Sequence, residues 1–383
     1  MVERFGLYVH IPYCRTKCPY CDFNVRAGTT WPETRYTDAL LAELGRYAAD
    51  SPFAGARLET VFFGGGTPSL FSARSIARVL DECRRLFRGS DIAEISLEAN
   101  PESVSAERLR DLRRAGVSRL SLGIESFRPE VLKRLGRLQT AAETRLAVPM
   151  AREAGFANVS LDLMFAIPGQ TLDDWRNDLE TALSFGPEHI SAYNLTYEEG
   201  TPFFDLRRAG KLAPLDDDVE ATMFEEARSR LGEAGYRAYE VSNFARLGFE
   251  ARHNLNYWNA GDYLGIGAGA HSHERRQARA RRWSNVRDPE AYIASALAGG
   301  AAVAGEELLE PAQAAGEFVF LQLRLADGLS EEAFQQRFGS ELATMFPGVD
   351  RLIADGLIER RGARVRLTPR GLLVADSVFA SFL

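Results

Sequence analysis

The sequence predicts an α/β protein that begins with an incomplete, TIM-like (β/α)6 barrel and ends in a smaller α+β domain of winged-helix-like outline. First, residues 1–196 alternate short β-branched runs with longer helical patterns, which is typical of βαβ units on a parallel sheet. Second, six such units are too few to close an eight-stranded barrel. Third, a chain of 383 residues exceeds the usual single core, so we expect two domains, at 1–245 and 246–383.

The first part of the chain contains strand-like runs at 6–10, 59–63, 94–99, 119–125, 158–164 and 189–195. Helical patterns lie between them at 33–48, 72–87, 105–115, 140–154 and 171–184, and a further helix is expected at 218–234. Ser72, Ser105 and Thr171 stand where three of these helices begin, and hydroxyl side chains are favoured as N-caps. In barrels of this type the reactive residues lie at the carboxyl ends of the strands, so we expect the functional site there.

The last part of the chain has a different pattern. Helical segments at 311–326, 330–338 and 347–355 precede two short strand-like runs at 357–361 and 364–367. Helices followed by a hairpin are the outline of a winged helix. Several arginines in this segment suggest DNA binding, but acidic residues are interspersed among them and the second helix is not markedly basic. We therefore expect a lid or partner-docking module rather than a nucleic-acid-binding one.

Three of the four cysteines, Cys14, Cys18 and Cys21, follow the first strand with the spacing C-x3-C-x2-C. Thiolates are suitable ligands for iron–sulfur clusters and for zinc. Three thiolates on a cubane cluster leave one iron without a protein ligand, whereas electron-transfer clusters usually take four cysteines. The motif therefore favours a [4Fe–4S] cluster with one iron open to chemistry.

Two other uses of these cysteines are weaker. A Cys3His zinc site would add His10, but zinc sites usually combine two separated pairs of ligands, and no second pair occurs. A disulfide is disfavoured in a long, cysteine-poor chain without a secretory signal. The fourth cysteine, Cys83, belongs to the apolar stripe of a helix, which predicts a buried core residue.

Polar or glycine residues recur where the strand-like runs end. The second run ends in Gly64-Gly65-Gly66-Thr67, and Glu98, Glu125, Asp162 and Thr196 stand at the ends of later runs or within them. Glycine permits positive φ and lets a ligand approach the backbone N–H groups. No Gly-Lys-Ser/Thr follows, so this is not a phosphate-binding Walker loop. Together with the cysteine loop these residues outline one pocket.

Six motifs occur in the order YVHIPYCRTKCPYCDF, FFGGGTPS, SLEANPES, RLSLGIESF, SLDLMFAIPGQT and RHNLNYW. In combination they resemble the coproporphyrinogen III dehydrogenase-like branch of the radical S-adenosylmethionine (SAM) superfamily, and within it the HemW-type haem chaperones. The resemblance spans nearly the whole chain. It implies a radical SAM barrel, a [4Fe–4S] cluster on Cys14, Cys18 and Cys21, and SAM chelated by the open iron.

The resemblance also implies a set of SAM-binding positions, namely Tyr8, Gly65, Gly66, Thr67, Glu98, Glu125, Arg137, Asp162 and Thr196. An arginine suits the carboxylate of the cofactor, and acidic side chains suit its ribose hydroxyls. Two positions depart from the family pattern. Glutamine often stands where this chain has Glu125, and glycine usually stands where it has Ala166.

Two features distinguish a chaperone from an enzyme of this branch. The dehydrogenases carry a further cysteine where this chain has Phe23, and HemW-type proteins carry H-N-x-x-Y-W, found here from His253 to Trp258. A neutral imidazole is a common haem ligand, so His253, Tyr257 and Trp258 are candidate haem-binding residues. The alternative is that they are packed residues joining the two domains. His271 and His273 are nearby candidate ligands.

The expected function is a haem chaperone that delivers haem, as cargo, to haem-accepting apoproteins. The alternative is an oxygen-independent coproporphyrinogen III dehydrogenase-like enzyme that performs oxidative decarboxylation in porphyrin biosynthesis. A flavodoxin- or ferredoxin-like electron donor for the cluster is a further expected partner. A homodimer is one arrangement left open, because the sequence does not reveal the oligomeric state.

The composition limits partners and location. A net charge of −7 gives no case for nucleic-acid binding. A run of five arginines, at 275, 276, 279, 281 and 282, predicts a solvated loop. The more specific interpretation is that this run contacts a membrane surface or an acidic partner. No run approaches the ~18 apolar residues of a spanning helix. Few cysteines and no export signal favour the cytoplasm.

Overall fold

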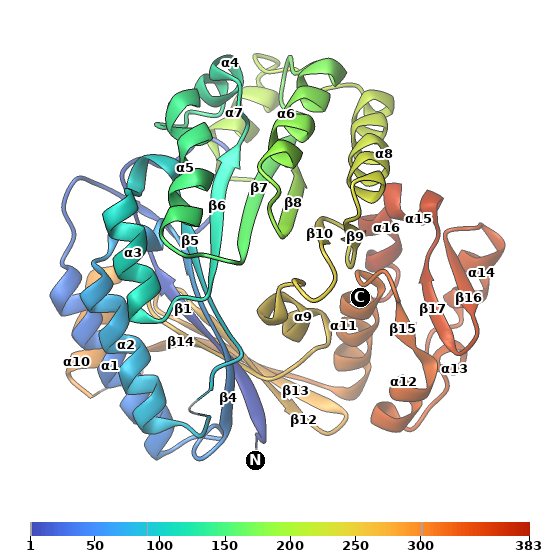
Figure 1. Ribbon diagram of the computed structural model, residues 1–383. Coiled ribbons are helices and arrows are strands. Elements are labelled where there is room, and N and C mark those ends of the chain that lie inside the picture. The colour runs from blue at the N-terminus through green and yellow to red at the C-terminus, as the bar shows by residue number, and fades with distance from the viewer. Residues whose placement is uncertain (1, 90, 300–301) are drawn as a thin grey trace.

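The computed structural model describes residues 2–89, 91–299 and 302–383. Within these residues, one curved sheet has the strand order β14-β13-β12-β11-β1-β4-β5-β6-β7-β8-β10-β9 (Figure 1). Its central strands are β1 (Arg4–Ile11), β4 (Arg57–Gly65), β5 (Glu94–Ala99), β6 (Arg119–Glu125), β7 (Val159–Phe165) and β8 (His189–Asn194). All neighbouring pairs among these six are parallel. They confirm the six predicted strands and the open, incomplete barrel.

The sheet continues at both ends beyond the predicted barrel. On one side β10 (Asn243–Ala245) pairs antiparallel with β8, and β9 (Arg237–Ala238) pairs antiparallel with β10. On the other side β11 (Tyr263–Ile266) lies parallel to β1, with Gly265 opposite Tyr8. Then follow the antiparallel strands β12 (His271–Arg276), β13 (Arg279–Asn285) and β14 (Val303–Leu309). Both ends of the sheet therefore contain strands from the second half of the chain.

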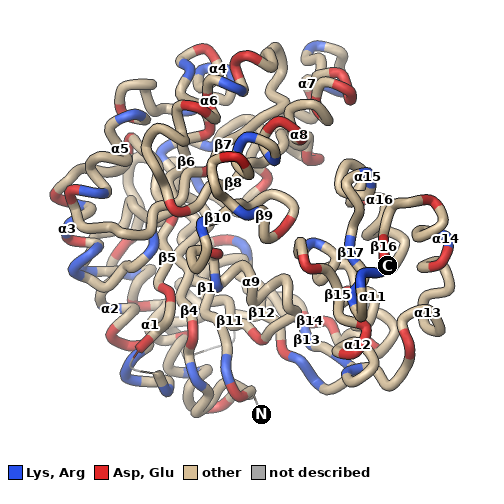
Figure 2. Tube along the Cα trace, turned by 45° about the vertical axis from the view of Figure 1, so that its right-hand side comes forward, with Lys and Arg blue, Asp and Glu red and all other residues tan. Residues whose placement is uncertain are grey.

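The predicted solvated loop of arginines at 275–282 is wrong, because these residues form the hairpin of β12 and β13. Ala280, Trp283 and Asn285 of β13 are buried, and the packing of these residues holds the strand on the sheet. Each of the five guanidinium groups lies within ion-pairing distance of a carboxylate: Arg275–Asp262, Arg276–Glu274, Arg279–Glu310, Arg281–Glu306 and Arg282–Glu307. Figure 2 shows basic and acidic residues interspersed along the chain. The run is therefore largely neutralised within the protein.

Helices cover the outer face of the central strands (Figure 1). They are α1 (Glu33–Ala49), α2 (Ala73–Leu86), α3 (Ala106–Ala115), α5 (Ala141–Glu153) and α6 (Leu172–Ser184). The three predicted N-caps are confirmed, since Ser72, Ser105 and Thr171 each accept a hydrogen bond from the backbone three residues later. Cys83 is fully buried in the main core, as expected.

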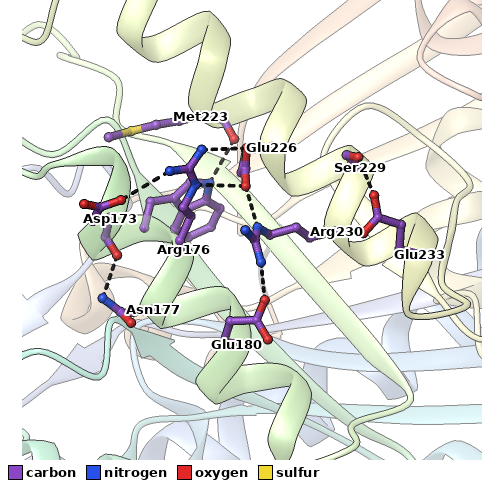
Figure 3. A network of polar contacts seen from close by, with 10 residues as sticks. Asp173, Arg176, Asn177, Glu180, Met223, Glu226, Ser229, Arg230 and Glu233 are labelled. Carbon is purple, nitrogen blue, oxygen red and sulfur yellow. Dashed lines mark hydrogen bonds and ion pairs between the residues drawn. The ribbon is translucent and has the colours of Figure 1, made fainter.

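Helix α8 (Asp217–Glu233) extends this layer beyond α6 and confirms the helix expected at 218–234. Figure 3 shows the contacts that join the two helices. Glu226 of α8 pairs with Arg176 of α6 at 3.0 Å and with Arg230 of its own helix at 2.5 Å. Arg230 in turn pairs with Glu180. The indole N–H of Trp175 donates to the carbonyl of Met223, 2.9 Å away and buried.

A second hydrophobic core lies in the last part of the chain. It includes Phe318, Phe334, Val349, Val365 and Phe379, and Figure 1 shows these elements in orange and red beside the sheet. The helices are α11 (Pro311–Leu323), α12 (Glu331–Phe338), α13 (Leu342–Met345), α14 (Gly348–Ala354), α15 (Pro369–Leu373) and α16 (Ala375–Ala380). The strands β15 (Leu329–Ser330), β17 (Arg364–Leu367) and β16 (Ile358–Arg361) form a small antiparallel sheet. This matches the expected α+β, winged-helix-like outline.

The predicted domain division at residue 245 stays a prediction. Packing shows that the main core includes Leu264, Trp283 and Tyr292, so hydrophobic contacts continue past residue 245. Among the described residues, no helix is both long and apolar enough to cross a membrane.

Candidate functional site

The three cysteines lie on a closed loop at the carboxyl end of β1. Two short strands, β2 (Tyr13–Cys14) and β3 (Arg26–Ala27), pair side by side and hold the base of this loop. The backbone N–H of Gly28 donates to the carbonyl of Cys14 at 2.9 Å. Cys14, Cys18 and Cys21 are all free and half-exposed. The loop therefore presents three thiols to the rim of the barrel, where the sequence predicts them.

The donor set fits a [4Fe–4S] cluster. Burial raises the pKa of the Cys14 thiol to about 11, and the neighbouring Cys21 and Cys18 add to this rise. Thiols held close together in this way are stabilised as thiolates by bound iron, which supplies the missing positive charge. Two donors face the sulfurs: Thr67 Oγ1 lies 3.4 Å from Cys14 Sγ, and Arg137 Nη1 lies 3.8 Å from Cys18 Sγ.

The geometry does not favour the zinc alternative. Both ring nitrogens of His10 are engaged, Nδ1 with the Tyr8 hydroxyl at 3.0 Å and Nε2 with the Asn24 carbonyl at 2.9 Å. In the described part of the chain, no three His, Cys, Asp or Glu side chains converge on a point that could hold one metal ion. A zinc ion needs its ligands within about 2.3 Å of one point, whereas each cysteine of a cubane cluster binds a different iron.

Asn24 ties the cysteine loop to the far end of the sheet. Its side-chain amide donates to the carbonyls of Ala268 at 3.0 Å and Arg287 at 2.9 Å. Gly269 has φ +73°, and a Cβ there would lie 2.5 Å from the Asn24 amide nitrogen. The strands after residue 260 therefore help to position the cysteines, a link that sequence reasoning missed because it joins residues more than 240 positions apart.

The glycine loop after β4 packs directly beneath the cysteine loop. Gly65 has φ +115°, and a Cβ on Gly66 would lie 2.6 Å from the Tyr13 carbonyl oxygen. The N–H of Gly66 donates to the Ile11 carbonyl at 2.8 Å, and that of Gly65 donates to Glu98 Oε2 at 3.2 Å. Only glycine allows this close approach. The loop is thus a turn and a wall of the site at once.

Three carboxyl groups line the same rim on neighbouring strands. Burial raises the pKa of Glu98 to about 8, and the nearby Asp162 adds to the rise. Burial also raises the pKa of Glu125 to about 7, an effect that the Arg137 guanidinium opposes. Burial raises the pKa of Asp162 too, although Ser191 and two further serine hydroxyls donate to it. Such a site attracts ligands that bring positive charge and hydroxyl donors.

Arg137 is a cation that lies beside Glu125 and the cysteine loop, and Arg119 is a second cation close to Glu98 and Asp162. The Arg137 side chain is 10% exposed, and its guanidinium lies 3.5 Å from the Glu125 carboxylate. It also donates to Asn100 Oδ1 at 2.8 Å and to the Gly123 carbonyl at 3.0 Å. Arg137 Nε donates a hydrogen bond to Gln139 Oε1 at 3.1 Å. Sequence reasoning did not single out Asn100 or Gln139, although Asn100 directly follows the third predicted strand.

Two further predicted positions differ in setting. Tyr8 lies on β1 beneath the pocket, with its ring stacked on Phe62, whereas Thr196 is exposed on the segment that follows β8.

The two positions that depart from the family pattern, Glu125 and Ala166, share an unusual backbone conformation. Glu125 and Ala166 both have φ 59°, a left-handed conformation that glycine adopts more easily than other residues. This left-handed backbone conformation explains why the family usually has glycine where this chain has Ala166.

The H-N-x-x-Y-W motif forms α9 (Arg252–Trp258), inside the curve of the sheet. His253 is fully buried, with Nδ1 2.8 Å from Thr60 Oγ1 and Nε2 2.8 Å from the Tyr257 hydroxyl. Its ring stacks on Phe62. Because both ring nitrogens are engaged, His253 has no free nitrogen to bind haem iron. Its contacts are those expected of a packed structural residue, which was the alternative interpretation of this motif. Trp258 is partly exposed, but its indole nitrogen is buried and has no hydrogen-bond partner among the residues that the structure describes.

A pocket of about 560 Å³ joins these features. Its walls come from the cysteine loop, from the ends of β1, β4 and β5 at Tyr8, Gly65 and Glu98, from α9, from β11 and β12, and from α11. The volume is within the range of about 300–1,000 Å³ usual for small-molecule sites. A larger cavity of about 1060 Å³ lies at the opposite, amino ends of the strands, around Glu3, Gly6 and Arg57. It contains none of the predicted site residues.

The chain matches two family models. Residues 8–182 match the radical SAM superfamily, and residues 309–374 match the HemN C-terminal domain. The first match contains all three cysteines and every predicted SAM position except Thr196.

Curated relatives resemble the chain over nearly its full length. The "Heme chaperone HemW" of Bacillus subtilis is 37% identical over 98% of this chain and 98% of its own. The protein of the same name from Mycobacterium tuberculosis is 41% identical over 100% of this chain and 95% of its own. The one from Escherichia coli is 37% identical over 99% of this chain and 98% of its own. Among solved structures, the coproporphyrinogen III oxidase HemN of Escherichia coli superimposes with a TM-score of 0.84 at 24% identity. It covers all of this chain and 90% of its own, and this likeness supports the fold.

Proposed function

The chain belongs to the radical SAM superfamily and, within it, to the HemW family, and from this membership we propose that it is a haem chaperone. It binds haem as cargo and delivers it to haem-requiring proteins, and it carries a [4Fe–4S] cluster and a SAM site. The observation that carries the proposal is the 560 Å³ pocket. It is lined by the cysteine loop, by the C-terminal helix α11 and by Tyr8, Gly65 and Glu98, which belong to the SAM-binding rim, the set of predicted SAM positions at the strand ends.

Cys14, Cys18 and Cys21 hold the cluster in this proposal. When bound, the cluster supplies single electrons to SAM. The half-exposed loop leaves its outer side open to an electron donor, and Thr67 and Arg137 direct donors toward the sulfurs. The tether from Asn24 to the carbonyls of Ala268 and Arg287 holds the loop in place.

The SAM site extends from the cysteine loop across the strand ends, and it comprises Tyr8, Gly65, Gly66, Thr67, Glu98, Glu125, Arg137, Asp162 and Thr196. Arg137 Nη1, between Glu125 and Cys18, binds the carboxylate of SAM. Glu98, Glu125 and Asp162 accept hydrogen bonds from hydroxyl groups and offset the positive charge of the sulfonium. His253, Tyr257 and Trp258 support the haem site from α9, and His253 does so through packing.

The alternative, a coproporphyrinogen III dehydrogenase-like enzyme, shares the fold and the cofactors. Phe23 stands where those enzymes carry a further cysteine, and full-length identity of 37–41% to curated haem chaperones favours the chaperone. We retain decarboxylation of a porphyrinogen as the activity to test if haem binding fails.

The partners follow from the proposed function. Haem-accepting proteins receive the cargo, and a flavodoxin- or ferredoxin-like donor reduces the cluster. The predicted cytoplasmic location suits both. A homodimer stays a prediction. So does contact with a membrane surface, for which the ion-paired arginines of β12 and β13 leave little free positive charge.

Haem transfer is the decisive test. The anaerobically reconstituted protein is titrated with haem, and the loaded protein is mixed with an apo-haem protein. We expect a saturable Soret band and its movement to the acceptor's spectrum. A protein that binds no haem specifically, but converts coproporphyrinogen III when SAM and reductant are present, would establish the enzyme instead.

A further inference from the structure

The five histidines of the chain differ sharply in their surroundings. His10, His189 and His253 are buried with both ring nitrogens hydrogen-bonded to neighbouring groups. His273 is also buried, with Nδ1 2.9 Å from the Gly261 carbonyl and Nε2 3.7 Å from Glu317. His271 is exposed, and in the described part of the chain neither of its ring nitrogens has a hydrogen-bond partner. It is thus the histidine available to a ligand.

His271 lies on the wall of the 560 Å³ pocket. It begins β12, close to Gly269 and the Asn24 tether, so the cysteine loop and the strand that carries His271 are fixed to one another. Partial burial and the positive charges of Arg287 and Arg282 lower the pKa of this imidazole. The ring is therefore neutral near pH 7 and has a lone pair to offer to a metal.

Arg287 lines the same pocket and is exposed. No carboxylate in the described residues lies within ion-pairing distance of its guanidinium, in contrast to the five paired arginines of the β12–β13 hairpin. An unpaired guanidinium at a pocket mouth suits an anionic group such as a carboxylate. Its placement beside a free imidazole gives the pocket one metal-binding group and one anion-binding group.

Aromatic side chains complete the pocket. Phe23, on the cysteine loop, is 60% exposed although it is a large apolar residue. Trp258 and Phe320 contribute rings from α9 and α11. A flat apolar macrocycle with a metal at its centre and carboxylates at its edge matches this combination of aromatic, imidazole and guanidinium groups.

We propose that His271 is the axial ligand of the haem cargo and that Arg287 binds a haem propionate. This assignment rests on the proposed haem-carrier function and deepens it. It places haem beside the cysteine loop and the SAM-binding rim, between the sheet and the C-terminal domain. His253 then acts by holding α9 in position rather than by coordinating iron.

The test is haem titration of the reconstituted full-length protein, followed by absorption and magnetic circular dichroism spectra. The His271→Gly variant should bind haem at least about tenfold more weakly, a loss seen even for outer-shell partners of metal ligands, and should lose the histidine-ligated spectrum. Free imidazole should restore that spectrum. The Arg287→Ala variant should bind more weakly with an unchanged spectral shape. Arg276→Ala, on the same hairpin but paired with Glu274, is the matched control.

The outcomes separate the two claims. If the unmodified protein shows no saturable haem binding, the proposed function fails. If it binds haem but His271→Gly keeps the same spectrum, the ligand assignment fails while the function stands. A weaker affinity in His271→Gly that imidazole does not rescue, with an unchanged spectrum, also overturns the assignment, because the residue then only packs against the ligand.

Discussion

The imidazole Nδ1 of His253 lies 2.8 Å from the hydroxyl oxygen of Thr60, inside the curve of the sheet. This contact joins α9 to the middle of β4. The opposite nitrogen is 2.8 Å from the Tyr257 hydroxyl, and Gly6 of β1 lies so close that a Cβ there would be 3.1 Å from the ring. The histidine of the H-N-x-x-Y-W motif is therefore a structural link between α9 and two barrel strands.

Replacing this histidine should destabilise the protein. The His253→Ala variant removes two buried hydrogen bonds and leaves a cavity, so we expect the free energy of unfolding to fall by about 2–4 kcal/mol. Urea denaturation followed by circular dichroism measures the change. Arg252→Ala, at an exposed neighbouring side chain, is the control. A loss below about 1 kcal/mol would contradict the structural role, since buried hydrogen-bonded groups cost more than this to remove.

The same residue should make stability depend on pH. Burial lowers the pKa of His253 to about 3 from its ordinary 6.5. Neutral His253 contributes its full stabilisation to the folded state above pH 6.5, the pKa in the unfolded chain. This contribution is lost as the pH falls toward the pKa of His253 in the folded protein. The stability advantage of the unmodified protein over His253→Gln should therefore shrink by about 1.4 kcal/mol per pH unit below 6.5.

Denaturation of both proteins at pH 7.5, 6.0 and 5.0 checks this expectation. Comparing the two proteins removes the contribution of the buried carboxyl groups, whose raised pKa values act in the opposite direction. A difference that stays constant over this range would show that His253 becomes protonated as easily in the folded state as in the unfolded chain.

Loss of one loop cysteine should abolish the cluster. The Cys18→Ser variant keeps only two thiolates, so after anaerobic reconstitution we expect it to contain almost no iron or acid-labile sulfide and to be colourless. Cys83→Ala is the matched control, because Cys83 is buried in the core and should not affect the brown colour. Zinc in place of iron in the unmodified protein, or a full cluster in Cys18→Ser, would contradict the assignment.

Arg137 should set the affinity for SAM. The Arg137→Gln variant keeps hydrogen-bonding capacity but loses the charge, and hydrogen bonds to charged groups contribute about 1.5–3 kcal/mol, so we expect binding to weaken by about 10- to 100-fold. Calorimetric titration of the reconstituted protein with SAM measures this. Arg114→Gln, at an exposed pair with Asp111, should bind SAM normally. Equal affinities in the two variants would remove Arg137 from the site.

Local patterns in the amino-acid sequence are enough to predict much of this fold and of its candidate site. The six barrel strands, their helices and the N-caps at Ser72, Ser105 and Thr171 follow from hydrophobic periodicity and capping, which operate over a few residues. The cysteine loop follows from its spacing, and the strand-end rule placed the glycine loop and the acidic residues on one rim. These features required no knowledge of distant contacts.

Other features depend on contacts between residues that are far apart in the sequence. β11 has only four residues, and it is a strand because β1, more than 250 positions earlier, offers it a parallel partner. His253 and His271 belong to the same small set of histidines in the sequence, yet one is enclosed by Thr60 and Tyr257 and the other is open to a pocket. Burial and free lone pairs depend on neighbours that folding brings together, and no local pattern encodes them.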